Sequence, residues 1–274
     1  MDIFQIKNAY THAGAFHTDD VISTVFVKKL NPSVNVHRVL DAPEGEFCFD
    51  IGHGEFDHHQ KDRKINRFGV PFCSFGLLWQ KYGRHYLQQL GFCKTEQAFE
   101  RFEETVVSKI DQGDNFGYKE VYAFFENDMI KAFLPNWYEQ ANKGMTYDKQ
   151  FAKAVEFADK LFDNWMRTLF ERVELGDIEY AEWQRAKQNA KDGIVVLDKN
   201  IPWRFLQKIS PIDNLLFVIT QSSRGGYAVS AVDSKVCGVT QSDYLHFVHP
   251  SHFTGCAHTL DNAILAAMQF AKSA

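Results

Sequence analysis

The segment from Phe49 to Gln60 carries the densest group of chemically active side chains in the sequence. It reads F-D-I-G-H-G-E-F-D-H-H-Q and includes Asp50, His53, Asp57, His58 and His59. Asp50 follows an apolar run, which predicts a carboxylate at the end of a buried strand, and the glycines after it allow a tight turn back toward that carboxylate. Carboxylate and imidazole ligands together suit Zn, Mn or Fe, and an Asp can bridge two ions. The segment predicts a metal site; the alternative is a polar turn with surface histidines.

A second polar group occupies the junction between a predicted strand at 7–11 and the helix that follows it. The junction holds His12, His17 and Asp19 in the spacing H-x4-H-x-D. Thr18 can cap the helix, and carboxylates in its first turn suit the helix dipole. Because α/β proteins place ligand sites where a strand ends and a helix starts, these three side chains are positioned for metal binding. A capping role is the alternative for Asp19.

A third acidic segment, K-I-D-Q-G-D-N, ends a predicted helix that begins at Thr95. Asp111 follows an apolar residue and is succeeded two residues later by Gly113, so it resembles a carboxylate that faces a metal ion. Asp114 is the competing choice in the same segment. The sequence therefore predicts Asp111 as a ligand, with Asp114 as its nearest rival.

Other segments are candidates for binding an anionic substrate. The triplet S-F-G from Ser74 to Gly76 begins a predicted helix, where free amides favour a phosphate. The basic run at 61–67 is either a solvated loop or a contact for a phosphate backbone. Arg224, followed by two glycines, and His249, beside a proline, are candidates nearer the C-terminus. A glycine pair is also typical of a simple hairpin turn.

The pattern of short apolar runs predicts an α/β fold. Strands are expected at 7–11, 35–40 and 46–51, with an amphipathic helix between the first two. Short strands separated by a helix indicate a doubly wound, mainly parallel sheet. Four further strands and a last helix predict a smaller, mixed α/β domain. These elements are expected at 194–197, 215–220, 227–232, 244–248 and about 258–271.

The same elements divide the chain into three parts. They are a metal-binding domain at 1–144, a helical connector at 145–192 and a smaller substrate-binding domain at 193–274. Nine of the 11 histidines fall into two groups, five at 12, 17, 53, 58 and 59 and four at 246, 249, 252 and 258. Two polar clusters from opposite ends of the chain predict an active site between the two domains.

Composition limits the class of protein. The 274 residues are 45% hydrophobic and 24% charged, an ordinary globular balance, and the formal net charge of -5 argues against a broad basic surface for duplex nucleic acid. No secretory signal is evident, and no apolar run reaches membrane-spanning length. The five cysteines are odd in number and scattered, which favours reduced thiols in a cytoplasmic protein. The oligomeric state is left open, with a homo-oligomer among the alternatives.

The motifs together resemble the DHH phosphoesterase superfamily, and most closely the melanocyte proliferating gene family. The resemblance rests on T-H-x-G-x-F-H-x-D-D, F-D-I-G, F-D-H-H-Q and I-D-x-G-D-N in this order. It continues through I-P-W-R, G-Y-A-V-S-A-V and F-V-H-x-S-x-F-x-G, the last of which ends at Gly255. The similarity therefore extends over nearly the whole chain.

The resemblance implies a DHH domain that holds two divalent ions, joined by helices to a smaller substrate-binding domain. The implied metal ligands are His12, His17, Asp19, Asp50, His58 and Asp111, with Asp50 bridging the ions. His59 would face the scissile phosphate, and Asp57 would orient a ligating imidazole. Many superfamily members have H-x3-D-x-D where this chain has H-x4-H-x-D, which leaves the role of His17 open.

The activity implied by the resemblance is 3'-to-5' exonucleolytic cleavage of RNA or short single-stranded oligonucleotides, by two-metal hydrolysis. Mn is the first choice of metal, with Mg, Zn and Fe as alternatives. The expected substrate-binding residues are Ser74, Gly76, Arg224, His249 and Gly255. A small-molecule phosphatase or pyrophosphatase with the same metal site is the nearest alternative. A non-catalytic, metal-stabilised binding protein is the alternative from another class.

Overall fold

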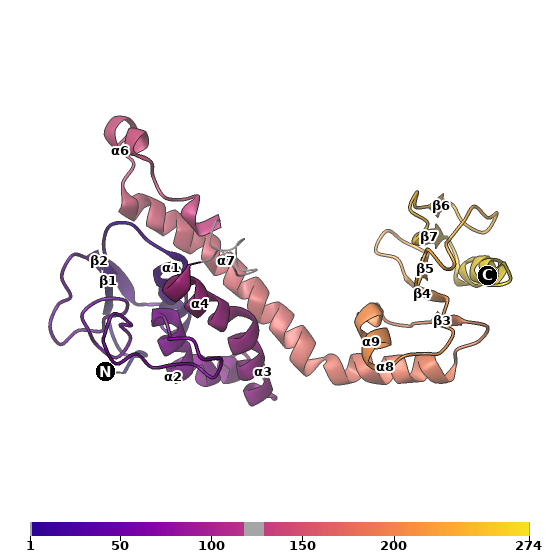
Figure 1. Ribbon diagram of the computed structural model, residues 1–274, viewed down its shortest axis with the longest axis horizontal. Helices are drawn as coiled ribbons and strands as arrows, with labels where there is room; N and C mark the ends of the chain where they lie inside the picture. The colour runs from indigo at the N-terminus through magenta and orange to yellow at the C-terminus, as the bar shows by residue number, and fades with distance from the viewer. Residues whose placement is uncertain (1, 118–128, 274) are drawn as a thin grey trace. The chain divides into compact units, whose positions relative to one another are not determined.

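The computed structural model describes residues 2–117 and 129–273, and the chain forms two compact units (Figure 1). The N-terminal unit is Met1–Glu174 and the C-terminal unit is Leu175–Ala274. The division between them falls inside the segment 145–192 that the sequence marks as a helical connector. Both units combine helices with strands, so the expected α/β class is confirmed.

The N-terminal unit surrounds one short parallel sheet with helices. The strands β1 and β2 pair in parallel, with Asn8 opposite Asn35 and His12 opposite Val39. Its elements are β1 (Asn8–His12), α1 (Thr18–Leu30), β2 (Asn35–Val39), α2 (Ser74–Gln89), α3 (Thr95–Phe102), a π-helical turn (Glu103–Val107), α4 (Ser108–Phe116), α6 (Trp137–Lys143) and α7 (Tyr147–Glu174).

The third strand expected at 46–51 is reduced to isolated bridges. The Tyr10 amide donates to the Phe47 carbonyl, and the Phe49 amide donates to the Tyr10 carbonyl. This run ends at Asp50, whose φ of 57° lies in the left-handed region and breaks extended pairing. The described part of the unit therefore holds a two-stranded parallel sheet with one bridged neighbour, smaller than the doubly wound sheet predicted.

Aromatic side chains form much of the core of this unit, as the high Phe content predicts. Phe26 on α1, Trp79 on α2, Phe102 at the end of α3 and Phe162 on α7 are almost completely buried. Their rings contact one another at tilted or edge-on angles, with Trp79 and Phe102 centroids 4.5 Å apart. Helix α7 thus contributes to the same core as the helices that carry the polar motifs, which fixes its position within the unit.

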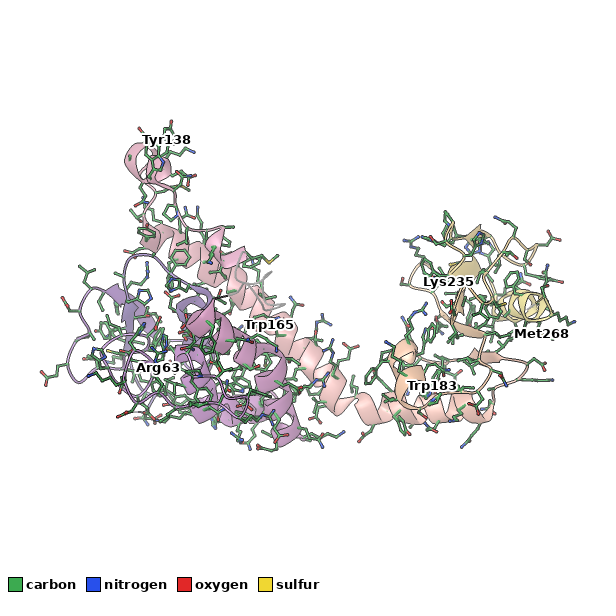
Figure 2. All side chains as sticks on the ribbon, in the orientation of Figure 1. Arg63, Tyr138, Trp165, Trp183, Lys235 and Met268 are labelled. Atoms are coloured by element: carbon green, nitrogen blue, oxygen red, sulfur yellow. The ribbon has the colours of Figure 1, made fainter. Side chains whose placement is uncertain are left out.

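The C-terminal unit is built on a mixed five-stranded sheet in the order β3-β4-β5-β7-β6. Only β3 and β4 are parallel; the other neighbours are antiparallel. Its elements are α8 (Gly176–Gln188), β3 (Ile194–Val196), α9 (Trp203–Ile209), β4 (Phe217–Gln221), β5 (Tyr227–Ala231), β6 (Phe247–Val248), β7 (Thr254–Ala257) and α10 (Leu260–Ala271). Trp183 on α8 is completely buried in this unit (Figure 2).

The strand β7 is an addition to the predicted elements, since no strand is predicted between 248 and 258. It is inserted between β5 and β6, and each of these neighbours pairs with it antiparallel. None of the helices in the described part of the chain is both long and apolar enough to cross a membrane.

Candidate metal centre

Asp50 lies at the centre of the polar cluster in the N-terminal unit, and its two carboxylate oxygens face different partners. Oδ2 lies 3.2 Å from Nε2 of His12, whereas Oδ1 lies 3.0 Å from Nε2 of His58 and 3.7 Å from Nδ1 of His59. The left-handed backbone at Asp50 turns the chain directly after the buried Phe49. One carboxylate therefore connects the strand-end histidine to the D-H-H turn.

Three overlapping groups of side chains in the described part of the chain could each hold a metal ion. The ligand atoms within each group lie within 4.8 Å of one another. The groups are His12, Asp20 and Asp50; Asp50, His58 and His59; and Asp19, His58 and Asp114. Because Asp50 and His58 each belong to two groups, the arrangement offers adjacent sites for more than one ion.

The carboxylate oxygens of the cluster are buried beside imidazole nitrogens. Oδ2 of Asp20 lies 3.2 Å from Nε2 of His12, and Oδ1 of Asp50 lies 3.0 Å from Nε2 of His58. Buried carboxylate oxygens are costly unless a positive group or a hydrogen-bond donor faces them, and a bound cation between oxygen and nitrogen would meet that need. The donor set, imidazole nitrogens and carboxylate oxygens, suits a divalent transition metal. The residues present therefore fit a metal site.

The electrostatics of the cluster also favour a cation. Hydrogen bonds that the His12 ring donates to Asp20 and then to Asp50 raise the pKa of His12 to about 11. Burial, together with the charges of Asp50 and Asp114, raises the pKa of Asp19 well above its usual range. Burial opposes charge on His58, yet the hydrogen bond to Asp50 and the charges of Asp19 and Asp114 raise its pKa to about 9. In the absence of a metal ion, protons on the histidines offset the carboxylates.

His12 is held in an orientation that suits metal binding. Its Nδ1 lies 3.1 Å from the carbonyl oxygen of Ala13, a hydrogen-bond distance. Donation of the Nδ1 proton to that carbonyl leaves the Nε2 lone pair for a ligand, on the side where Asp20 and Asp50 lie.

Asp19 is held by the start of helix α2. Its carboxylate accepts the backbone N–H groups of Ser74, at 3.0 Å, and Phe75, at 2.7 Å. The Ser74 hydroxyl donates to the carbonyl of Phe56, which is near the D-H-H turn. The amides expected to receive a substrate phosphate are therefore occupied by a carboxylate of the protein. Ser74 and Gly76 are both buried, and Gly76 packs against the side chain of Asp111.

Asp114, rather than Asp111, belongs to the groups of possible ligands. Oδ2 of Asp114 lies 3.4 Å from Nε2 of His58. Asp111 is completely buried, and its carboxylate accepts the Cys73 amide and the side-chain amide of Asn66, each at 2.9 Å. Burial raises the pKa of Asp111 to about 6. With both oxygens engaged, Asp111 supports the start of α2 and the loop that contains Asn66.

His17 is exposed and lies outside the three groups, although the motif comparison gives it a ligand role. Its backbone N–H donates to Oδ1 of Asp20 at 2.7 Å, at the start of α1. Its ring centroid is 6.3 Å from that of His12. The structure thus places Asp20, which is not among the predicted ligands, beside His12. The D-D pair in the first turn of α1 is the sequence signal that could have identified it.

Asp57 orients His59 and the backbone of the turn. Its Oδ1 accepts the His59 backbone N–H at 3.0 Å and lies 2.8 Å from Nδ1 of the His59 ring. Its Oδ2 accepts the His53 N–H at 2.6 Å. Although burial opposes it, the hydrogen bonds from the His59 and His53 amides lower the pKa of Asp57. The His59 ring itself is 57% exposed, so it can reach a bound molecule.

A cavity of about 330 Å³ adjoins the cluster. Asp57 and His58 form part of its lining, and so do the apolar side chains Phe72 and Leu77. The cations Arg63 and Lys64 of the basic run also line it, and Arg63 is labelled in Figure 2. A molecule in this cavity would contact His58 and two cations at once.

The remaining predicted substrate residues belong to the C-terminal unit. Arg224 is exposed in the turn between β4 and β5, where Gly225 and Gly226 form the hairpin connection. His249 follows β6, and its Nδ1 accepts the Ser251 amide at 3.1 Å. Gly255 on β7 is buried, and a Cβ there would lie 2.8 Å from Leu245 and Val239, so the residue serves packing within this unit.

The fold and the cluster together define an α/β protein with a histidine–aspartate centre able to hold metal ions. Residues 8–246 match the model of the family MYG1_exonuc, described as an uncharacterised protein family (UPF0160), and the chain belongs to that family. This is the melanocyte proliferating gene family that the motifs resemble, and its name indicates an exonuclease-type activity. Searches of curated proteins and of solved structures each found no match.

Proposed function

We propose that this protein is a metal-dependent phosphodiesterase that removes nucleotides from the 3' end of RNA or short oligonucleotides by two-metal hydrolysis. The observation that carries the proposal is the shared carboxylate of Asp50, whose Oδ2 faces His12 and whose Oδ1 faces His58. A carboxylate whose two oxygens face different donor groups can serve two metal ions at once, which suits two-metal catalysis. The family name supports the nuclease class.

The ligands follow from the three donor groups. His12 and Asp20 would hold one ion, Asp19, His58 and Asp114 would hold the other, and Asp50 would be shared by both. When bound, divalent ions, with Mn as the first choice, polarise a phosphoryl oxygen and lower the pKa of a coordinated water. The α2 amides bonded to Asp19 fix the orientation of that carboxylate.

His59 is the side chain proposed to act on the substrate phosphate. Asp57 fixes the ring through Nδ1, and the ring is largely exposed, which leaves Nε2 for the substrate. In this position His59 can donate a hydrogen bond to a phosphoryl oxygen and stabilise the charge that increases in the transition state. Asp57, buried and bonded to two amides, supports that geometry.

The adjoining cavity is proposed to receive the substrate end. Its acidic residues are Glu55, Asp57 and Asp62. Asp57 is engaged by three N–H groups of the turn, and Glu55 pairs with Lys81 at 2.7 Å. Arg63 donates one N–H to Asn115 at 2.9 Å and keeps other donors. Cations beside an apolar wall suit a nucleotide, which combines a phosphate with a flat apolar base.

Arg224 and His249 are proposed to contact substrate phosphates from the C-terminal unit. The His249→Ala variant should turn over RNA more slowly than the parent protein. Wild-type turnover of this variant on every phosphoester tested would remove His249 from the proposal.

The deciding experiment is cleavage of an end-labelled short RNA by metal-stripped protein, with Mn and Mg restored separately. Loss of nucleotides from the 3' end that requires metal and is absent in Asp50→Ala supports the proposal. Cleavage of mononucleotides or pyrophosphate alone would identify a small-molecule phosphatase instead. No hydrolysis of either class, with metal still bound, would identify a metal-stabilised binding protein.

A further inference from the structure

The guanidinium of Arg38, on β2, connects the metal centre to the start of helix α7. Its Nε donates to the main-chain carbonyl of His12 at 3.2 Å, and its Nη2 donates to the carbonyl of Gly14 at 2.7 Å. Its Nη1 lies 2.7 Å from Oδ1 of Asp148. The Arg38 side chain is only 6% exposed, so its contacts with the two carbonyls are shielded from solvent, whereas Asp148 is 70% exposed.

Aromatic rings enclose the same guanidinium. The Arg38 Cζ atom lies 4.4 Å from the ring centroid of Phe151 on α7 and 5.6 Å from that of Phe16. Phe16 and Phe151 also contact each other edge to face, with centroids 5.4 Å apart. Phe16 belongs to the loop between His12 and α1, so the arginine contacts both the carbonyls and the apolar part of this loop. Stacking and hydrogen bonding together leave the guanidinium with one orientation.

We infer that Arg38 is the positioning residue for His12, a role that rests on the proposed metal site. The loop after His12 turns at Gly14, whose φ is 88°. Because the loop lies outside helices and strands, no regular secondary structure makes it rigid. Arg38 fixes the carbonyls at both ends of this turn, and the Nδ1 contact of His12 with the Ala13 carbonyl lies between them. The ring orientation that directs Nε2 toward Asp20 and Asp50 thus depends on Arg38.

The chemistry of the contact requires arginine. A planar guanidinium can donate to two carbonyls and one carboxylate at the same time, whereas the compact ammonium of lysine cannot span all three. Asp148 and Phe151 show that the first turn of α7 takes part in this support, although the sequence marks that segment only as a connector.

Metal affinity of purified, metal-stripped protein tests the inference. Isothermal titration with Mn should give a dissociation constant about 10- to 100-fold weaker for Arg38→Met than for the parent, the range typical of lost support for a ligand. Arg38→Lys should fall between the two because it keeps the charge but not both carbonyl contacts. Asp148→Asn should change the constant less than about threefold, since Asp148 is 70% exposed.

Lys29→Met is the matched control. Lys29, in the last turn of α1, pairs with Asp159 at 2.9 Å and Asp163 at 2.6 Å on α7. Like the Arg38 variants, Lys29→Met removes a cation that contacts α7. Unlike Arg38, Lys29 lies at the end of α1 opposite to the His12 loop. The variant should lose thermal stability and keep its Mn affinity. If Arg38→Met and Arg38→Lys bind Mn as tightly as Lys29→Met does, the inference is overturned. If Arg38→Met does not fold, the lysine variant decides.

The His12 ring signal in metal-free protein separates this inference from the proposed function. Its NMR resonance should shift or broaden in the Arg38 variants and stay unchanged in Lys29→Met. An unchanged His12 signal in the Arg38 variants rejects the positioning role, whether or not the protein binds metal. If the parent protein binds no metal, yet the His12 signal changes in the Arg38 variants, the proposed function is rejected. Arg38 then remains the support of His12.

Discussion

Nε2 of His58 lies 3.4 Å from Oδ2 of Asp114, although Asp111, one helical turn earlier, is the more completely buried carboxylate. Both residues belong to α4, and residues three apart lie near the same face of a helix. What separates them is the neighbouring structure. The Cys73 amide and Asn66 engage Asp111, whereas Asp114 reaches the cluster that contains His58 and Asp19.

Asp114→Asn and Asp111→Asn should therefore have different effects. Asp114→Asn should weaken Mn binding about 10- to 100-fold with little loss of stability, since it removes a ligand charge. Asp111→Asn should lower the free energy of unfolding by about 1–3 kcal/mol, because an amide cannot accept from both donors. Titration calorimetry and urea denaturation measure the two quantities. The opposite assignment of effects would restore Asp111 as the ligand.

Asp50→Asn should reduce both the number of bound ions and the rate of hydrolysis. The substitution keeps the size of the side chain but replaces one of the two carboxylate oxygens that face His12 and His58 with a nitrogen that cannot bind metal. We expect fewer ions per chain by elemental analysis and a fall in RNA cleavage of more than about 100-fold. A variant that retains the parent's metal content would exclude a bridging role.

Asp57→Asn should impair turnover more than metal binding. The carboxylate fixes the His59 ring and two amides of the turn, and Asp57 lies outside the three donor groups. We expect kcat to fall about 10- to 100-fold with Mn affinity within about threefold of the parent. His59→Gln is the companion variant and should show a similar loss. Equal losses of affinity and kcat would instead place His59 among the metal ligands.

Metal binding should release protons and strengthen as the pH rises. The pKa of His12 is raised to about 11 and that of His58 to about 9, so both rings are protonated in metal-free protein at neutral pH. Each proton displaced by a metal ion adds a slope of about tenfold in affinity per pH unit. Calorimetry in buffers of different ionisation enthalpy counts the protons. Zero release at neutral pH would show that another group carries the charge.

The same pKa shift affects the stability of metal-free protein. Because the pKa of His12 is higher in the folded state than its ordinary value of 6.5, protonation of His12 stabilises the fold fully below that value. This contribution disappears as the pH rises toward about 11. Thermal melts of metal-free parent and His12→Gln across this range should differ most at low pH and converge at high pH. A constant difference would contradict the assignment.

Lys64→Met should raise KM for RNA and reduce the dependence of KM on salt. Lys64 lines the cavity that adjoins His58, and a lost phosphate contact lowers the salt sensitivity of binding. Lys61→Met removes the same charge from the same loop but not from the cavity lining, so it serves as the control. Equal KM values for the two variants would show that only the general charge of the loop matters.

The chemical class of the site could be predicted from the order of residues along the chain. Local patterns of apolar residues and glycines predicted the first strand, the helix that follows it and a turn after Phe49. The predicted cap was wrong, because His17 rather than Thr18 is the N-cap residue of α1. The motif order also predicted the family that the comparison confirms. These features depend on neighbouring residues, and for that reason a linear pattern suffices to find them.

Which polar side chains meet depends instead on how distant segments pack. The choice of Asp114 over Asp111, and of Asp20 over His17, depends on contacts with residues distant in the sequence. The amides of α2 bind Asp19 rather than a substrate because α1 and α2 pack together. Arg38 shows the same limit, since its partner Asp148 is 110 residues away. Local patterns specify which groups are available, whereas packing between distant segments determines which of them remain free to bind a ligand.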